Sequence, residues 1–164
     1  MANGDQPVVY TNCLVTLEIP GVTDNGMEKL LFNSFTPPSW STEAPKHKFF
    51  NGKLVETVHG GTINESWSPM QLGRGVDKNY VLYKWVEQVR QKPVEEAKKT
   101  VTVTVKTQAD DGVHVWTGEG AIIVQYGQTA HSSGTNETLL ENVSIEAERW
   151  AMKDGGGSDI APLS

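Results

Sequence analysis

Residues 73–92, GRGVDKNYVLYKWVEQVRQK, decide the fold class, because they predict one short amphipathic helix in a chain that otherwise favours strands. The apolar side chains at the i, i+3, i+4 and i+7 positions, which we expect to pack against a sheet, are Leu82, Trp85, Val86 and Val89. Asp77 is an N-cap residue type and Pro93 ends the pattern, so the helix is predicted over about 78–92. One helix covers one side of a curled sheet but not both faces of a parallel one.

The segments on either side of this helix have the two-residue period of strands. Before it, residues 10–19 alternate, with Cys13 placed inward as a small hydrophobe. After it, residues 100–106 alternate strictly between Thr and Val, and the Asp-Asp-Gly sequence at 110–112 predicts a hairpin turn. Residues 113–117 and 119–126 are predicted as two further strands. A last strand over about 139–152 would be far longer than the common length of about five or six residues.

These patterns predict a mainly β fold, an antiparallel β-barrel or sandwich with one flanking α-helix. We expect residues 1–9 to form a flexible or assembly arm, 10–153 to form a single domain, and 154–164 to form a mobile tail. Segments 29–35 and 66–72 are each predicted as one strand. Residues 37–62, rich in polar residues, Pro and Gly, are interpreted as a strand pair with a long loop.

Composition excludes several classes of protein. The chain has 164 residues, 37% hydrophobic content and a formal net charge of −6, which argues against a dedicated nucleic-acid binder. No apolar run approaches the roughly 20 residues that span a bilayer, so no membrane insertion is expected. The first residues lack the basic and apolar regions of a signal peptide, so none is expected. The single cysteine excludes an internal disulfide.

The sequence contains no motif for catalysis, metal or cofactor. The four histidines, His47, His59, His114 and His131, have no metal-ligand spacing. Residues 73–75 could hold an anion at the helix start, but a tight turn is the favoured reading. Glu146 and Glu148 would lie about 7 Å apart on one strand face, as in a glycosidase pair, although a solvated β face is the favoured interpretation. We therefore expect no enzyme and no cofactor.

Four stretches resemble the tail tube proteins of contractile phages and phage-like contractile injection systems, which are related to the type VI secretion tube protein. The similarity covers about residues 12–152 and rests on order and spacing. The stretches are LVTLEIPG at 14–21, MQLGRG at 70–75, YKWVEQVRQ at 83–91 and AIIVQYG at 121–127. Gly73 stands where the family usually has a long polar residue.

This resemblance implies a structural subunit that forms six-membered rings stacked into a rigid inner tube, a conduit for cargo or DNA. The implied partners are further copies of the chain and the sheath and baseplate proteins of one phage tail-like particle. Strands from all subunits would merge into one barrel around a water-filled lumen. The expected wet face consists of Thr100, Thr102, Thr104, Ser144, Glu146 and Glu148, with the intervening apolar residues packed.

Residues 1–9 and 37–62 are polar and poor in core-forming periodicity, so we expect them to contact neighbouring subunits or the next ring. The alternative function is a monomeric β-sandwich that binds a ligand such as carbohydrate, with Trp40, Trp67 and Trp116 as stacking surfaces.

Overall fold

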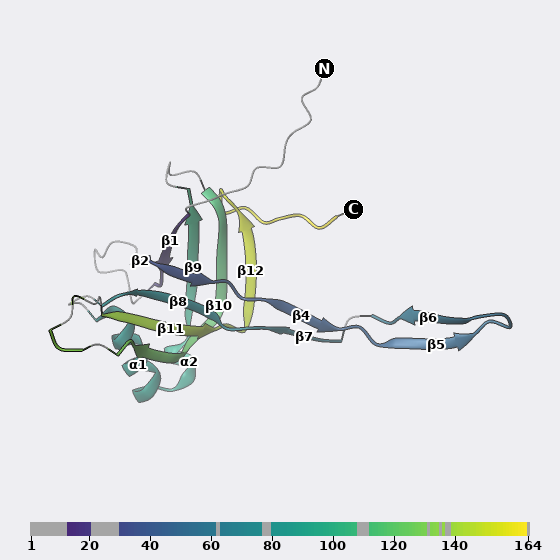
Figure 1. Ribbon diagram of the computed structural model, residues 1–164, viewed down its shortest axis with the longest axis horizontal. Coiled ribbons are helices and arrows are strands. Elements are labelled where there is room, and N and C mark those ends of the chain that lie inside the picture. Colours follow the sequence, from purple (N-terminus) through teal and green to yellow (C-terminus); the bar gives the residue numbers. More distant parts are fainter. Residues whose placement is uncertain are drawn as a thin grey trace, which may run out of the picture.

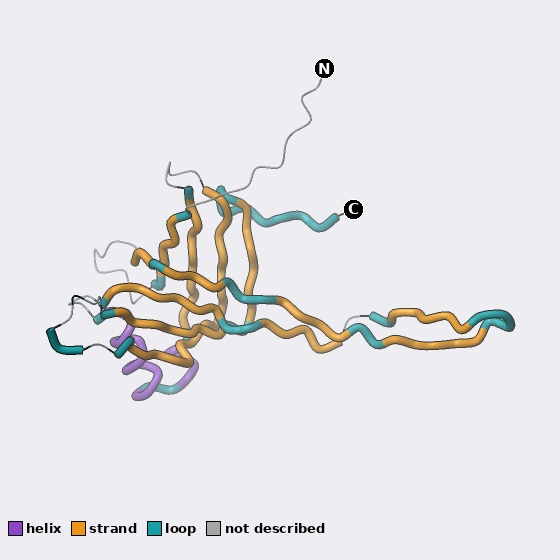
Figure 2. The backbone as a smooth tube through the Cα atoms, in the orientation of Figure 1, coloured by secondary structure: helices purple, strands orange, loops and turns teal. Residues whose placement is uncertain are grey.

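A computed structural model describes residues 13–20, 30–61, 63–76, 80–107, 112–130, 132–134, 136 and 139–163. These residues form a mainly β fold with antiparallel pairing throughout, which confirms the predicted fold class (Figures 1 and 2). The strands before the helices are β1 (Leu14–Glu18), β2 (Leu30–Phe32), β3 (Ser34–Thr36), β4 (Trp40–Glu43), β5 (Lys46–Phe50), β6 (Val55–His59), β7 (Ile63–Trp67) and β8 (Met70–Gly75). Then follow α1 (Val81–Gln91), α2 (Val94–Ala97), β9 (Lys99–Lys106), β10 (Gly112–Gln128), β11 (Leu140–Glu146) and β12 (Arg149–Asp154).

Two sheets share the long strand β10. Sheet A has the order β2-β1-β9-β10-β12 and uses the first half of β10, while sheet B has the order β3-β8-β11-β10 and uses the second half. Figure 1 shows β10 leaving the upright strands of sheet A and turning into the crosswise strands of sheet B. The two sheets therefore enclose one core between their inner faces.

The bend in β10 changes two predictions. Residues 113–117 and 119–126 form one strand of 17 residues, and the predicted strand over 139–152 is two strands, β11 and β12. β12 pairs with the first half of β10 and β11 with the second half. The break at Ala147 and Glu148 lies opposite Gly120, whose φ of 61° few residues other than glycine adopt readily. Both strands bend at one corner because the chain must pass from one sheet to the other.

Helix α1 runs from Val81 to Gln91, within the predicted range, and a short second helix, α2, follows directly. Pro93 separates the two helices, since it ends the first pattern and serves as the N-cap of α2. The N-cap of α1 is Tyr80 at φ 51°, and its side chain makes no capping hydrogen bond. The predicted cap, Asp77, lies outside the described residues.

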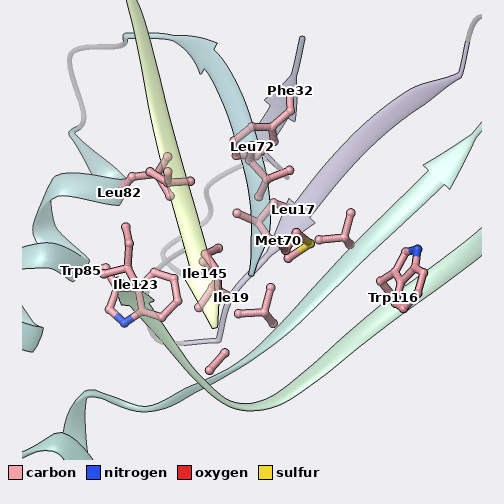
Figure 3. Close-up of a cluster of buried hydrophobic side chains, with 14 of the residues drawn as sticks. Leu17, Ile19, Phe32, Met70, Leu72, Leu82, Trp85, Trp116, Ile123 and Ile145 are labelled. Atoms are coloured by element: carbon pink, nitrogen blue, oxygen red, sulfur yellow. The ribbon is translucent and has the colours of Figure 1, made fainter. Parts of the chain in front are cut away.

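The core lies between the two sheets and α1. Figure 3 shows side chains from both sheets and from the helix meeting in this space. The fully buried side chains of greatest volume are Trp85, Leu17, Ile19, Met70, Leu82, Ile145, Val101 and Val103. Strand β9 shows the predicted alternation, with Val101, Val103 and Val105 buried and the threonines between them more exposed.

Residues 40–61 and 63–67 form a projecting arm instead of a strand pair with a long loop. The arm consists of two successive antiparallel ribbons, β4–β7 next to the body and β5–β6 at the far end (Figure 1). Backbone and side-chain bonds between Ser39 and Ser68 join the first ribbon to β3 and β8 of sheet B. Each strand of the arm is short, so its strand pattern in the sequence is weak, and the strands are recognised only from their pairing across the hairpin.

Four smaller predictions are corrected. The predicted strand over 29–35 divides at Asn33 into β2 of sheet A and β3 of sheet B, and the strand over 66–72 divides into β7 and β8. Cys13, directly before β1, is exposed instead of placed inward. The glycines at 73 and 75 belong to β8, paired with β11, instead of a turn. Residues 1–9, predicted as an arm, lie outside the described residues.

Candidate assembly surfaces

The predicted packing face of the helix contacts the core to different depths. Leu82 and Trp85 are fully buried, whereas Val86 and Val89 are partly buried and pack against the edge of the core. The indole Nε1 of Trp85 donates a hydrogen bond of 3.0 Å to the backbone oxygen of Ala97. This bond ties α1 to α2, so the large side chain also fixes the segment that leads into β9.

The six residues expected to form one wet face lie in three places. Thr100, Thr102 and Thr104 are on the outer side of sheet A, and Ser144 and Glu146 are on the outer side of sheet B. Glu148 lies after β11 at the corner and forms an ion pair with Lys98. The ammonium of Lys98 donates hydrogen bonds to this carboxylate and to Glu95, and the bond to Glu148 is the main cause that raises the pKa of Lys98. Since the strand is broken between them, Glu146 and Glu148 do not form a carboxylate pair on one strand face.

Ser144 was expected to face water, but only 8% of it is exposed in this subunit. It lies between two long polar side chains, because Gln71 and Gln125 are its partners on the neighbouring strands. Its hydroxyl lies 3.4 Å from the Oε1 of Gln125 and donates to it. Polar neighbours rather than an apolar core therefore cover this hydroxyl.

The outer face of sheet B carries a groove of about 370 Å³ that is lined mainly by uncharged polar side chains. Its polar side chains are Ser34, Thr36, Gln71, Gln125, Gln128, Asn142 and Ser144. Gly73 lies in this face between Ser34 and Asn142, and a Cβ atom at Gly73 would come within 2.8 Å of the Oδ1 of Asn142. A side chain at this position would require the side chains of Ser34 and Asn142 to turn away.

The inner face of sheet B holds a buried ion pair that the sequence reasoning missed. Arg74 on β8 and Glu141 on β11 are register partners, and their Nε and Oε1 atoms lie 3.2 Å apart with both side chains nearly buried. The hydroxyl of Tyr126 donates a 2.9 Å hydrogen bond to Glu141, and burial raises the pKa of this tyrosine. The sequence did contain a signal for this pair. Glu141 alternates in phase with the apolar Val143, which places its carboxylate on the buried face of the strand, and a buried carboxylate needs a partner.

Sheet B ends on both sides in an edge that pairs with no described strand. On one side, β3 pairs only with β8. On the other side, β11 is the one described strand that pairs with residues 122–128 of β10, because β9 and β12 pair with the first half of the strand. Unpaired edges leave backbone donors and acceptors open to strands of another chain. Two such edges on one sheet are suited to a closed ring of copies.

The far ribbon of the arm exposes apolar side chains that no described part of the body covers. Phe50 is 69% exposed, and Leu54 and Val55 are each 66% exposed. A lone two-stranded hairpin is marginally stable in water, and its apolar side chains favour contact with another surface. The end of the arm is therefore a second candidate contact between subunits.

The described residues also bear on the other candidate sites. They include no group of three or more His, Cys, Asp or Glu side chains that could hold a metal ion. Of the three tryptophans considered as stacking surfaces, Trp67 and Trp116 pack edge to face with ring centroids 6.1 Å apart and do not form a flat platform, while Trp40 is 51% exposed. No helix in the described residues is long and apolar enough to cross a membrane.

Comparisons with known proteins agree on one fold. In the structure of the anti-feeding prophage baseplate, symmetrised sixfold, one chain matches at TM-score 0.66 and 17% identity, over 92% of this chain and 98% of that chain. A chain of the sheath–tube complex of the extracellular contractile injection system PVC matches at 0.58 and 18% identity, over 92% and 93%. Hcp1 from Salmonella typhimurium matches at 0.56 and 10% identity, over 91% and 99%. A search of curated proteins finds no match.

The sequence itself places the chain in a family of structural proteins. The family model for T4-like virus tail tube protein gp19 matches residues 18–151, and the chain belongs to this family. The protein is thus a structural subunit of a tube in a phage tail-like particle and not an enzyme. The predicted resemblance to tail tube proteins is confirmed.

Proposed function

We propose that this chain forms six-membered rings that stack into the inner tube of a contractile injection system or phage tail. The observation that carries the proposal is sheet B, a four-stranded sheet with a polar outer face and two edges unpaired by described strands. Edge-to-edge contact of six copies would close these sheets into one barrel and satisfy the open backbone groups. The sixfold baseplate structure that contains a similar chain supports this ring size.

In this arrangement the outer face of sheet B lines the channel. Its groove carries amide and hydroxyl groups and no charged side chain, and Glu146 lies near one end of the same face. Such a surface stays hydrated and offers neither cations for DNA phosphates nor a broad apolar area for a protein. A conduit for DNA or protein cargo needs this low affinity. Thr100, Thr102 and Thr104 of sheet A would then lie on the outer side of the tube.

The proposed partners are proteins of the same particle: sheath proteins on the outside of the tube and baseplate proteins at its end. Their contact surfaces would include sheet A and the helices, because these elements lie on the side opposite to the polar face. The sheath–tube complex with a similar chain supports this assignment.

Negative-stain microscopy of the purified protein tests the assembly. We expect rings and short tubes, and a uniform 18.0 kDa monomer at high concentration would contradict the proposal. A cysteine scan on assembled tubes tests the channel, in a Cys13→Ser background. Gln125→Cys and Asn142→Cys should react with a small thiol probe but not with a maleimide on a large polymer, whereas Thr100→Cys should react with both. The reverse pattern would assign the channel to sheet A.

A further inference from the structure

A groove of about 210 Å³ separates α1 from the unpaired edge of β10. This volume is many times what one water needs, so the open groove has room for a large side chain. Its apolar lining comes from Val86 and Val89 on the helix and from Ile123, Val124 and Tyr126 on the strand. The register of β10 shifts between Ile123 and Gln125, and Val124 at this bulge is 47% exposed beside the groove.

The β4–β7 ribbon, which follows the β3 and β8 side of sheet B, carries a large exposed aromatic side chain. Trp40 begins β4, which continues the edge of β3, and it is 51% exposed. Its register partner is Trp67, which packs against the core beside Trp116. Side chains of register partners lie on the same face, so Trp40 and Trp67 share one face of the β4–β7 ribbon, the face through which Trp67 contacts the core between the sheets. Helix α1 packs against the same core.

The distribution of charged residues favours Trp40, rather than the exposed end of the arm, as the side chain that fills this groove. Helix α1 and the residue after it carry Lys84, Arg90 and Lys92 against one carboxylate, Glu87. The ribbon that carries Trp40 has Glu43 and Glu65 and no basic residue in either strand. The far ribbon carries Lys46, Lys48 and Lys53 against Glu56, so its basic charge would be repelled by the helix.

We propose that Trp40 of one subunit fills the groove between α1 and β10 of the next subunit in the ring. This inference rests on the proposed function, because the two edges meet only when copies stand side by side. The indole anchors the contact, and the carboxylates beside it lie against the basic side of α1. An aromatic residue in a desolvated pocket is the usual centre of such an interface.

Substitution of Trp40 provides the first test. Trp40→Ala should raise the subunit concentration needed for rings by at least about 30-fold, the effect of losing a 2 kcal/mol anchor. Trp40→Phe should keep rings, and Phe50→Ala, a matched exposed aromatic on the far ribbon, should keep them also. Because Trp40 is half exposed in the single subunit, circular dichroism and the melting temperature of Trp40→Ala should match those of the parent.

Cross-linking between copies provides the second test, in a Cys13→Ser background that retains Trp40. A chain with Thr42→Cys is mixed with a chain with Arg90→Cys, and a short bismaleimide should join them in assembled rings but not when either variant is alone. Replacing Arg90→Cys with Thr100→Cys is the control and should give no product. Rings without the cross-link, or rings from Trp40→Ala at the parent's concentration, would overturn the inference while leaving the proposed function intact.

Thiol labelling of the groove separates the remaining outcomes. Val89→Cys in the non-assembling Trp40→Ala chain should react fully, and protection there would mean that the chain's own residues fill the groove, which overturns the inference. If the parent protein forms no rings under any condition, the proposed function fails and the inference fails with it.

Discussion

The body and the arm of this molecule are built from the same element, the antiparallel strand pair, but they differ in what supports it. In the body, strands from two sheets and one helix bury a common set of apolar side chains. In the arm, the near ribbon contacts the core through Trp67, whereas the far ribbon is held by its own ladder and is exposed along both strands. The body can be stable as a single copy, whereas the exposed apolar side chains of the arm need a partner to cover them.

The largest expected loss of stability comes from a substitution at the centre of the body. Trp85→Ala should lower the free energy of unfolding by about 3–5 kcal/mol, because it removes a fully buried indole and leaves a cavity between α1 and the sheets. It also removes the hydrogen bond to the Ala97 oxygen. Urea unfolding of the single subunit measures the loss. A melting temperature equal to that of the parent would disprove the packing role of this face.

The buried ion pair should give the second-largest effect, again in the body. Glu141→Ala leaves the guanidinium of Arg74 buried without its carboxylate and should cost about 3 kcal/mol. The double variant Arg74→Met with Glu141→Leu replaces the pair with apolar groups and should recover most of that loss. If the double variant is no more stable than the single one in urea unfolding, the pair acts through the bond to Tyr126 instead.

Removing the far ribbon should barely change stability and should prevent tube growth. The backbone of Gly60 donates a 2.7 Å hydrogen bond to Pro45, so residues 46–59 can be excised and the gap closed with an Asn-Gly turn. We expect a change in unfolding free energy within about 0.5 kcal/mol, since no core side chain is lost. Microscopy should then show rings without long tubes.

A matched variant separates the ribbon's length from its apolar surface. Phe50→Ser with Leu54→Ser keeps the ribbon and removes two of its exposed side chains, and it should also prevent stacking. Tubes of normal length from both proteins would mean that the arm is not the stacking contact and that the rims of the barrel are.

The smallest expected effect is a pH dependence that arises in the body. Burial lowers the pKa of His114, so the folded state favours the neutral imidazole. The unfolded state binds the proton first, near its ordinary pKa of about 6.5, so this stabilisation is present above that pH and is lost as the pH falls toward the folded pKa. Melting temperatures between pH 7.5 and 5 should show a smaller decline in His114→Gln than in the parent. His47→Gln, a substitution on the exposed far ribbon, should decline as the parent does.

The sequence alone determined the elements with strong local periodicity and the kind of protein. The helix face of Leu82 and Trp85 and the alternation of Val101, Val103 and Val105 follow from spacing, because a side chain's phase in a helix or strand is set by neighbours a few residues away. The family followed from the order of four short stretches. Glu141 also carried a signal, since a carboxylate in the apolar phase of a strand requires a buried partner.

Only the tertiary structure decided how the strands divide between two sheets. Alternation of polar and apolar residues continues unchanged through a bend. The sequence therefore predicted one strand where β11 and β12 meet at the corner beside Gly120, and it placed Ser144, Glu146 and Glu148 on one face. The choice of sheet depends on partners far away in the chain. The pairing of Arg74 with Glu141, the polar cover over Ser144 and the two open edges of sheet B all come from those long-range pairings, which the packing of one common core selects.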